Sequence, residues 1–409
     1  MLKSAYSDTM LDIRKKINQN NIVFIARDIE KALGKNPKGS YYIITNNTQY
    51  ASEQSGNTFL IDEDDILDTR NLLKHEKTKK VISNLQEPKL VVFKNTKQIQ
   101  RICDQEDWEL LNPSAEIINE VEQKISQVEW LESLTELMPD FEVKTCKEIE
   151  FSGTPFILQF NRAHTGSGTH LINDKDQLQR IKEKYPDRPA KISEYLEGDM
   201  FTLNCVVGSR NTLSSSISYQ ITGVEPFTDN RFATVGNDWS IAEQTLTQEQ
   251  KEKIKKIGAE IGDKLRQDRF RGLFGIDVIK TKEGKIKLIE INARQPASTT
   301  FESQLQKKEG LNDKITTFEA HLAAMLELEL NREIKNINNG SQIIYRNKTK
   351  NKIDPDKMKD ELEECGYKVI KYNNKKPGSE LLRIMSTSNI VEEIKDNKIT
   401  TDIYEKITK

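Results

Sequence analysis

The sequence predicts an α/β protein of two or three lobes. Its first 120 residues alternate short β-rich runs with charged amphipathic segments, a pattern typical of an open layer of parallel strands with helices between them. Two β-type runs much later, within 272–294, form a predicted hairpin that carries acidic side chains. A chain of 409 residues, at about 100–200 residues per domain, has room for two or three cores.

The N-terminal strands are expected at residues 21–27, 41–45, 58–62 and 89–93. Between the first two, Gly34–Ser40 (GKNPKGS) resembles a phosphate-binding loop only loosely, because the GxxxxGK[ST] spacing is absent. We interpret this segment as a turn.

The composition argues against several classes of partner. Basic and acidic residues nearly balance, at 62 against 64, so nothing favours nucleic acid or a membrane surface. No run approaches the roughly 18 apolar residues of a transmembrane helix, and the N-terminal residues lack the apolar core of a signal peptide. The four cysteines form no zinc or disulfide pattern. We therefore expect a cytoplasmic protein.

The hairpin reads GLFGIDVIKTKEGKIKLIEINAR and gathers oxygen ligands on one face. A turn of four residues would place Asp277 opposite Leu288 and diagonal to Glu290, about 7–8 Å away at the backbone. Side-chain alternation then adds Asn292 to the same face. Two carboxylates and an amide are hard ligands that suit Mg²⁺. A solvated polar face is the alternative, but the apolar start of this face fits it poorly.

Gly-Ile-Asp, a hairpin and then Glu-Ile-Asn-Ala-Arg resemble the metal-binding end of the ATP-grasp enzymes, the group that includes biotin carboxylase and D-alanine:D-alanine ligase. The resemblance implies that Glu290 and Asn292 hold Mg²⁺ or Mn²⁺ against the ATP phosphates and that Asp277 supports them. It also implies that Arg294 faces the transferred phosphoryl group.

The same resemblance implies a domain plan. Residues 1–120 would form a pre-ATP-grasp α/β domain and residues 121–330 the ATP-grasp domain. Within the latter, a flexible lid lobe would span about 150–195 and a metal-binding lobe about 196–330. The resemblance barely covers residues 331–409, whose own strand and helix pattern predicts a small α/β subdomain without recognisable chemistry.

Lys124 is the first candidate phosphate ligand. It lies in a predicted helix, AEIINEVEQKISQVEWLESL (115–134), outside the apolar face. In the ATP-grasp family a lysine at this point, shortly after an Asn-Pro turn, reaches an ATP phosphate. A solvated helix lysine is the alternative.

A small-residue loop provides the second candidate. It consists of Gly166, Ser167, Gly168 and Thr169. Glycine lets backbone N–H groups approach phosphate oxygens, so the loop suits a lid over triphosphate, with a simple hairpin turn as the alternative. The strand before it carries Gln159 where the family usually has lysine. Arg162 is a candidate replacement for the missing charge.

The segment KISEYLEG (191–198) resembles the ATP-grasp hinge that reads adenine through its main chain. The resemblance assigns nucleotide binding to Glu194, Tyr195, Leu196 and Glu197. Many relatives then place an acid on ribose where this chain has Met200. Glu197 and Asp199 are possible substitutes.

Two further residues are weighed in the second half of the chain. Arg231, in a long polar loop, could bind a substrate carboxylate, although a surface role is favoured. His321 lies on an apolar helix face and is expected to be packed.

Together these features predict an ATP-dependent carboxylate–amine ligase that works through an acyl phosphate on small-molecule substrates. An amino acid or short peptide is a guess by analogy, and a homodimer is left open. Two alternatives remain. One is an ATP-grasp kinase that phosphorylates a hydroxyl, and the other is a nucleotide-binding module without turnover, favoured by Gln159 and Met200.

Overall fold

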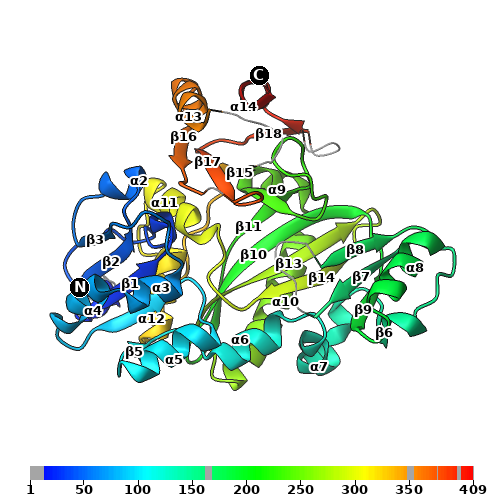
Figure 1. Cartoon of the computed structure of the whole chain (residues 1–409), viewed down its shortest axis with the longest axis horizontal. Coiled ribbons are helices and arrows are strands. Elements are labelled where there is room, and N and C mark those ends of the chain that lie inside the picture. The colour runs from blue at the N-terminus through cyan, green and yellow to red at the C-terminus, as the bar shows by residue number, and fades with distance from the viewer. Residues whose placement is uncertain (1–12, 162–167, 348–353, 375, 394–397, 409) are drawn as a thin grey trace.

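The computed structural model describes residues 13–161, 168–347, 354–374, 376–393 and 398–408. Their strands form sheets of five, four, eight and two strands, and Figure 1 shows the first three side by side across the molecule. The predicted α/β fold, with an N-terminal parallel sheet and antiparallel lobes, is confirmed. None of the helices in these ranges is long and apolar enough to span a membrane.

The N-terminal sheet is parallel, in the order β3-β2-β1-β4-β5. Its elements are β1 (Ile22–Ala26), η1 (Ile29–Lys31), β2 (Tyr41–Asn46), α2 (Gln49–Ser52), β3 (Thr58–Ile61), α3 (Thr69–Lys74), α4 (Glu76–Ser83), β4 (Lys89–Val92), α5 (Lys97–Gln105) and β5 (Glu109–Leu110). All five residues of β1 are buried, as expected for a parallel strand that is covered on both faces. Asp68 and Thr96 cap α3 and α5 through their side-chain oxygens.

The predicted helix over 115–134 is interrupted. The structure has α6 (Ala115–Glu122), α7 (Ser126–Leu131) and a 3₁₀ segment, η2 (Glu132–Leu137). Asn161, directly after the strand β7 (Phe156–Phe160), replaces the missing helical bonds. Its side-chain oxygen accepts from the Ile125 N–H at 2.9 Å, and its amide nitrogen donates to Gln123 at 2.9 Å. Lys124 therefore lies in a turn instead of a helix.

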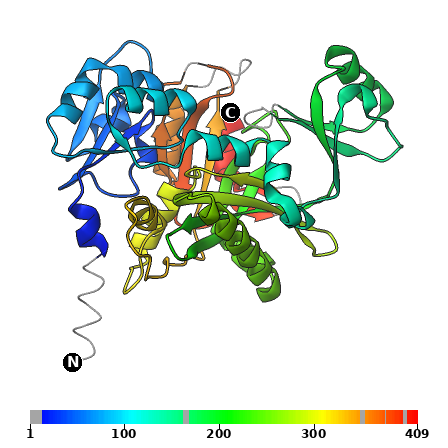
Figure 2. The same cartoon turned by 90° about the horizontal axis from the view of Figure 1, so that it is seen from below.

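The lid is a four-stranded antiparallel sheet that projects from the rest of the molecule (Figure 2). It comprises β6 (Phe141–Thr145), η3 (Cys146–Glu148), β7 (Phe156–Phe160), β8 (Thr169–Ile172), α8 (Lys175–Lys184) and β9 (Pro189–Glu194), in the sheet order β6-β9-β7-β8. Its own small core includes Leu158, Phe160 and Ile172 on one face. The opposite face is therefore available to line a site.

The eight-stranded sheet has the order β14-β13-β10-β11-β12-β15-β17-β16. Its strands are β10 (Gly198–Val207), β11 (Thr212–Thr222), β12 (Thr234–Asp238), β13 (Gly272–Thr281), β14 (Ile286–Asn292), β15 (Ser341–Arg346), β16 (Lys368–Lys371) and β17 (Glu380–Ser386). The other elements are α9 (Trp239–Thr245), α10 (Gln248–Gln267), α11 (Thr299–Lys308), α12 (Thr317–Met325), α13 (Pro355–Glu364), β18 (Val391–Glu393), β19 (Lys398–Ile399) and α14 (Thr401–Thr408).

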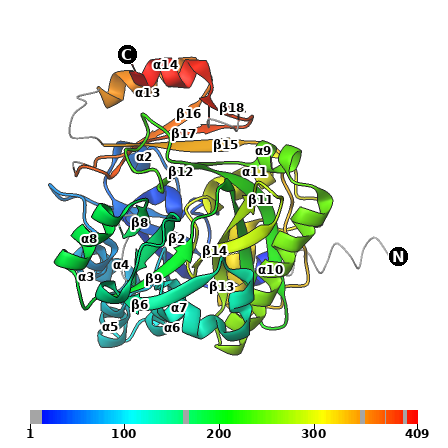
Figure 3. The same cartoon turned by 90° about the vertical axis from the view of Figure 1, so that its right-hand side faces the viewer.

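The C-terminal strands extend this sheet. Residues 331–409 were expected to form a small subdomain of their own, but β12 pairs with β15, with Gly236 opposite Ile343. Figure 3 shows β15, β16 and β17 continuing beside β12, with α13 and α14 above them. Pairing with β15 gives the backbone groups of β12 partners that an exposed sheet edge would lack. The C-terminal region is thus placed beside the strands that face the lid.

Helix α12 joins the N-terminal sheet to the large sheet. Phe318 stacks on Phe24 of β1 at a centroid distance of 6.1 Å. On the same helix, His321 is buried, and its Nδ1 accepts from the Leu273 N–H at 3.0 Å. Burial lowers the pKa of His321 to about 3, so this histidine is packed and neutral.

Two glycines let α10 approach the large sheet closely. A Cβ added to Gly258 would lie 2.8 Å from Cys205 Sγ, and a Cβ added to Gly262 would lie 2.4 Å from the Thr212 side chain. Glycine is therefore required here for close packing.

We predict that Gly262→Ala lowers the free energy of unfolding by about 1–3 kcal/mol, because overpacking against the stiff Thr212 side chain outweighs the better helix propensity of alanine. Chemical denaturation should detect the loss, and Thr212→Ala in the same chain should partly restore stability. Lys255→Ala, on the exposed face of α10, is the control. A Gly262→Ala protein as stable as the parent would contradict this account.

Candidate active site

A cavity of about 420 Å³ lies between the lid and the large sheet. The predicted site residues that line it are Lys124, Gln159, Gly168, Thr169, Glu194, Tyr195, Leu196, Asp277, Glu290, Asn292 and Arg294. They come from five separate stretches of the chain. The structure therefore brings together residues that the sequence could only relate by motif.

Some predicted residues are not part of this wall. Gly166, Ser167 and Arg162 lie outside the described residues. Glu197 pairs with Lys282 at the surface, and Asp199 pairs with Lys280 at 3.0 Å. Neither acid suggested for ribose lines the cavity.

Arg231 is an exposed loop residue, as favoured from the sequence. Its Nη2 donates to the Tyr195 hydroxyl at 3.0 Å. Tyr195 lines the cavity, so Arg231 contacts the hinge from outside.

The register of the hairpin differs from the prediction. Asp277 pairs directly with Glu290, and Val278 pairs with Leu288. The two pairs differ in register because a β-bulge inserts an extra residue, Ile289, between Leu288 and Glu290. Leu288 is consequently buried in the core beside Val278, not on the acid face, and the two carboxylates are closer neighbours than a diagonal pair.

Asp277 is held by donors on both of its oxygens. Thr202 Oγ1 and Gln220 Nε2 donate to Oδ1 at 2.8 and 2.5 Å, and Asn292 Nδ2 donates to Oδ2 at 3.1 Å. Desolvation, and then the charge of Glu290, raise the pKa of Asp277 to about 7. Because the Asn292 amide nitrogen donates to Asp277, the Asn292 amide oxygen points away from that carboxylate.

Glu290 has the opposite electrostatics. Burial would raise its pKa, but Lys124 outweighs burial with an ion pair of 2.7 Å, and Arg294 and Lys191 add to the effect, so the pKa of Glu290 is lowered. A carboxylate with a lowered pKa therefore lies directly beside one with a raised pKa. A cation between them would remove that repulsion.

The donor set fits a divalent metal through oxygen ligands. Asp277, Glu290 and the Asn292 amide are the hard donors that Mg²⁺ prefers. Across the described ranges, no group of three or more His, Cys, Asp or Glu side chains could hold a metal ion. This site offers two carboxylates, so substrate phosphates would have to complete the coordination.

Arg294 is fixed by a residue that the sequence did not single out. Its Nη1 donates to Glu122 Oε1 at 2.5 Å, and Lys94 also pairs with Glu122. Burial would lower the pKa of Arg294, but Glu122 raises it, which keeps the guanidinium charged. Glu122 closes α6, so the helix end sets the position of this arginine.

Lys191 is a second residue that the sequence analysis missed. It is directly opposite Gln159 on the neighbouring strand and is 2% exposed. Burial, and then the charge of Lys124, lower its pKa to about 7. No hydrogen bond or ion pair engages it within the described part of the chain.

A signal for Lys191 was present in the sequence. In β9 its neighbours Ala190 and Ile192 pack into the lid core, as Leu158 and Phe160 do around Gln159 in β7. Alternation therefore turns Lys191 and Gln159 to the cavity face together. Comparing the outward-facing positions of β7 and β9 together would have identified Lys191 as the cation opposite Gln159.

Comparisons with known proteins identify a domain type and a shared fold. A family model described as the ATP-grasp domain matches residues 121–298. No curated protein sequence matches the chain.

Solved structures share its architecture at low identity. N5-carboxyaminoimidazole synthase from Aspergillus clavatus, in complex with ADP and 5-aminoimidazole ribonucleotide, has a TM-score of 0.63 at 16% identity, covering 96% of this chain and 99% of that chain. N5-carboxyaminoimidazole ribonucleotide synthetase from Thermotoga maritima has a TM-score of 0.60 at 13% identity, covering 95% and 97%.

A third similar structure is the biotin carboxylase domain of the 2-oxoglutarate carboxylase from Hydrogenobacter thermophilus, a dimer with MgADP, ADP and bicarbonate. Its TM-score is 0.59 at 12% identity, with coverage of 90% of this chain and 86% of that chain. At such identities the likeness shows a shared fold. The family match is to residues 121–298, which therefore resemble an ATP-grasp domain.

Proposed function

We propose that this protein is an ATP-dependent carboxylate–amine ligase that forms an acyl phosphate. One observation carries the proposal: three cations, Lys124, Lys191 and Arg294, share a cavity with the two carboxylates Asp277 and Glu290. Phosphoryl transfer needs positioning and charge neutralisation of this kind.

The hinge end of the cavity suits adenine. Apolar side chains of Met138, Ile157, Leu196, Met200 and Ile279 line it. A flat apolar slot beside hinge backbone groups would hold the base, with main-chain atoms of Glu194 and Leu196 as its hydrogen-bonding partners. The acids near the hinge are paired elsewhere, so ribose would depend on other contacts.

The phosphates would lie along the cations. Lys124 and Lys191 would contact the inner phosphates, and Gly168 and Thr169 would cover them from the lid. Asp277, Glu290 and Asn292 would hold Mg²⁺ or Mn²⁺, which would supply charge neutralisation of the β- and γ-phosphates. Lys124 would then leave Glu290 for a phosphate oxygen.

In the reaction, a substrate carboxylate oxygen bonds to the γ-phosphorus as the bond from that phosphorus to ADP breaks. Arg294, fixed by Glu122, stabilises the charge on the transferring group. An amine then attacks the acyl carbon, inorganic phosphate leaves, and the amine proton passes to solvent. Closure of the lid would exclude water from the acyl phosphate.

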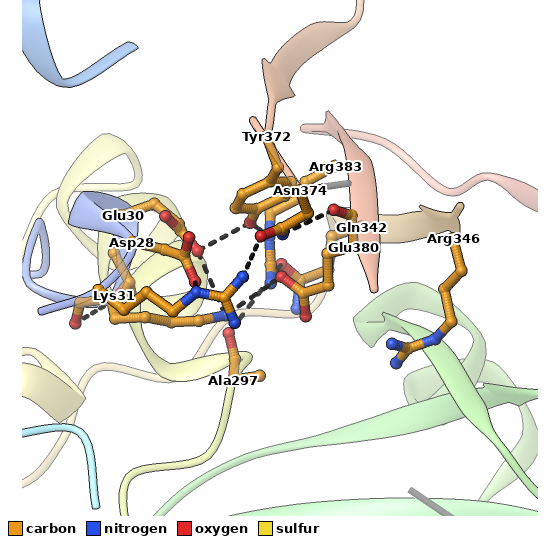
Figure 4. Close-up of polar contacts among 12 residues, drawn as sticks. Asp28, Glu30, Lys31, Ala297, Gln342, Arg346, Tyr372, Asn374, Glu380 and Arg383 are labelled. Atoms are coloured by element: carbon orange, nitrogen blue, oxygen red, sulfur yellow. Dashed lines mark hydrogen bonds and ion pairs between the residues drawn. The ribbon is translucent and has the colours of Figure 1, made fainter. Parts of the chain in front are cut away.

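As domains we propose residues 1–120, 121–330 and 331–409. The lid lobe would span about 150–195 together with β6, which pairs with β9 in the same sheet, and the metal-binding lobe about 196–330. The third domain would share its sheet with the second through the pairing of β12 with β15. One side chain of this third domain, Arg346 (Figure 4), lines the same cavity.

We predict that hydroxylamine intercepts the acyl phosphate and gives a hydroxamate from the acid substrate when ATP is present, even without the natural amine. Amino acids, dipeptides and small carboxylates should be screened for hydroxamate and ADP. ADP release with an alcohol and no hydroxamate from any acid would favour a kinase instead. The absence of any substrate-stimulated ADP release would favour a nucleotide-binding module without turnover.

We predict that Glu290→Gln loses metal-dependent nucleotide binding, because a neutral amide beside Asp277 removes the ionised metal ligand. Calorimetric titration with Mg·ATP should show at least a tenfold weaker affinity, consistent with about 1.5–3 kcal/mol for charged interactions. Glu283→Gln, in the exposed hairpin turn, is the control. Unchanged affinity and turnover in Glu290→Gln would refute the metal assignment.

We predict that Lys191 supplies the charge missing from Gln159. Lys191→Gln should weaken ATP binding about tenfold or more, and Gln159→Lys in that background should recover much of it, because the two positions are opposite each other. Lys144→Gln, an exposed lid lysine, controls for net charge. Equal affinities in all four proteins would show that neither strand contacts phosphate.

A further inference from the structure

A second hollow opens beside the cavity and has no role in the proposed function. It is a groove of about 620 Å³ between the lid strand β8 and the loop 223–233, which joins β11 to β12. Thr169 and Phe232 line both the groove and the cavity, so the two spaces meet at these residues. A substrate whose reacting end lies in the cavity could therefore extend into the groove.

One wall of the groove is the edge of a β-sheet. The five consecutive residues 169–173 all line it. Successive residues of a strand point to opposite faces, so a groove lined by all of them follows the edge of the strand instead of one face. β8 is the last strand of the lid sheet, and β7 pairs with its other side.

The backbone of this edge has unused hydrogen-bonding groups. The Phe160 N–H donates to the Gly168 carbonyl at 3.2 Å, and the register places His170 in the next hydrogen-bonded pair with β7. Hydrogen-bonded and open positions alternate in an antiparallel pair, so the N–H and C=O groups of Thr169 and Leu171 point away from β7. Within the part of the chain that the structure describes, no hydrogen bond engages these outward groups.

The opposite wall is a loop with a fixed base. The Gly223 N–H donates to the Ala233 carbonyl at 3.0 Å and closes the base of the loop. Phe227 is fully buried in the core of the large sheet. The tip of the loop, residues 229–232, lines the groove. A ligand in the groove would thus contact the lid on one side and the large sheet on the other.

The two edges of the lid sheet differ in their protection. Proteins commonly guard an open edge with charged side chains or proline. The other edge strand, β6, carries Glu142 and Lys144, which pair with each other. β8 reads Thr-His-Leu-Ile, and burial lowers the pKa of His170, so this strand has neither proline nor a charge at neutral pH. The unguarded edge is the one that borders the cavity.

The charged side chains of the groove favour a carboxylate. They are Arg180, Arg231 and Asp229. Arg180 makes no ion pair among the described residues, and Arg231 donates to the neutral Tyr195 hydroxyl. Even with Asp229 ionised, one positive charge of these lining residues is unbalanced. A ligand with a carboxylate would complement it.

We propose that the groove binds an extended peptide substrate, which adds a strand to the lid sheet along β8. Main-chain hydrogen bonds to Thr169 and Leu171 would hold it whatever its side chains, and Arg180 would attract its carboxylate. A strand rises about 3.3 Å per residue, so the edge 169–173 matches a peptide of about four or five residues. The proposal rests on the ligase function, and it makes one of the two ligase substrates a peptide.

The test uses the full chain saturated with Mg·AMP-PNP, with alanine, dialanine and tetra-alanine titrated separately by calorimetry. Affinity should rise about tenfold from dialanine to tetra-alanine, because the longer peptide can bond to both Thr169 and Leu171. Tetra-alanine methylated on its amide nitrogens should lose about the same factor. Hydrogen exchange of residues 168–173 should slow when tetra-alanine binds, since free outward N–H groups become bonded.

A proline substitution tests the edge itself. Leu171→Pro removes one outward N–H and keeps the bonds to β7, so it should weaken tetra-alanine about threefold to tenfold. Val143→Pro is the matched control on the other lid edge: the Glu194 N–H donates to the Asp140 carbonyl, and that register leaves the Val143 N–H pointing outward. It should not change binding. Arg180→Gln should weaken tetra-alanine but not its C-terminal amide.

Three results would overturn the proposal. They are equal affinity for dialanine and tetra-alanine, no binding of any of the three probes, and equal weakening by Leu171→Pro and Val143→Pro. The first two would leave a single amino acid or another small molecule as the substrate. Thermal unfolding without ligand checks each variant, and if Leu171→Pro does not fold, the methylated peptide decides.

This outcome is separable from that of the proposed function. Peptide binding needs no turnover, so length-dependent binding without hydroxamate from any acid would refute the ligase and keep the groove. Hydroxamate from a single amino acid, without peptide binding, would do the reverse. If Mg·AMP-PNP does not bind, the same titrations without nucleotide still decide on the groove.

Discussion

The direct pairing of Asp277 with Glu290 is the constraint on which the rest of the site depends. Two carboxylates opposite each other on one face repel, and a protein tolerates them only with compensating donors and cations. The compensation comes from distant parts of the chain: Thr202 and Gln220 donate to Asp277, and Lys124 pairs with Glu290. The ion pair between Lys124 and Glu290 holds the turn that follows α6 against the large sheet.

That turn depends on an uncharged side chain. Asn161 accepts from the Ile125 N–H and ends the helix before Lys124, so the lysine can reach the acids. Glu122 is the last residue of α6, two residues before Lys124, and it fixes Arg294. A continuous helix through 115–134 would have placed Lys124 differently. The interruption therefore sets the position of Lys124, and the end of α6 sets that of Arg294.

Much of the fold, and many of the residues that line the cavity, could be predicted from the sequence. Period-two alternation and the motifs in 272–294 gave the hairpin and its acids, because short-range pattern determines strand faces. The bulge at Ile289 did not follow, since an inserted residue leaves composition unchanged and only the partner strand reveals it. The sheet extension by β15, β16 and β17 was likewise a matter of long-range pairing, which no local window contains.

Lys191 shows why a motif tied to one strand can mislead. The cavity needs positive charge at a place in space, and that place is bordered by β7 and β9 together. Either strand can supply it, so Gln159 alone could not decide whether the charge was lost. Arg346 extends the reasoning to a third region: a cation from β15 reaches the same cavity although 52 residues separate it from Arg294 in the sequence. Which side chains share a face is therefore the more reliable guide to this site than which residue follows which.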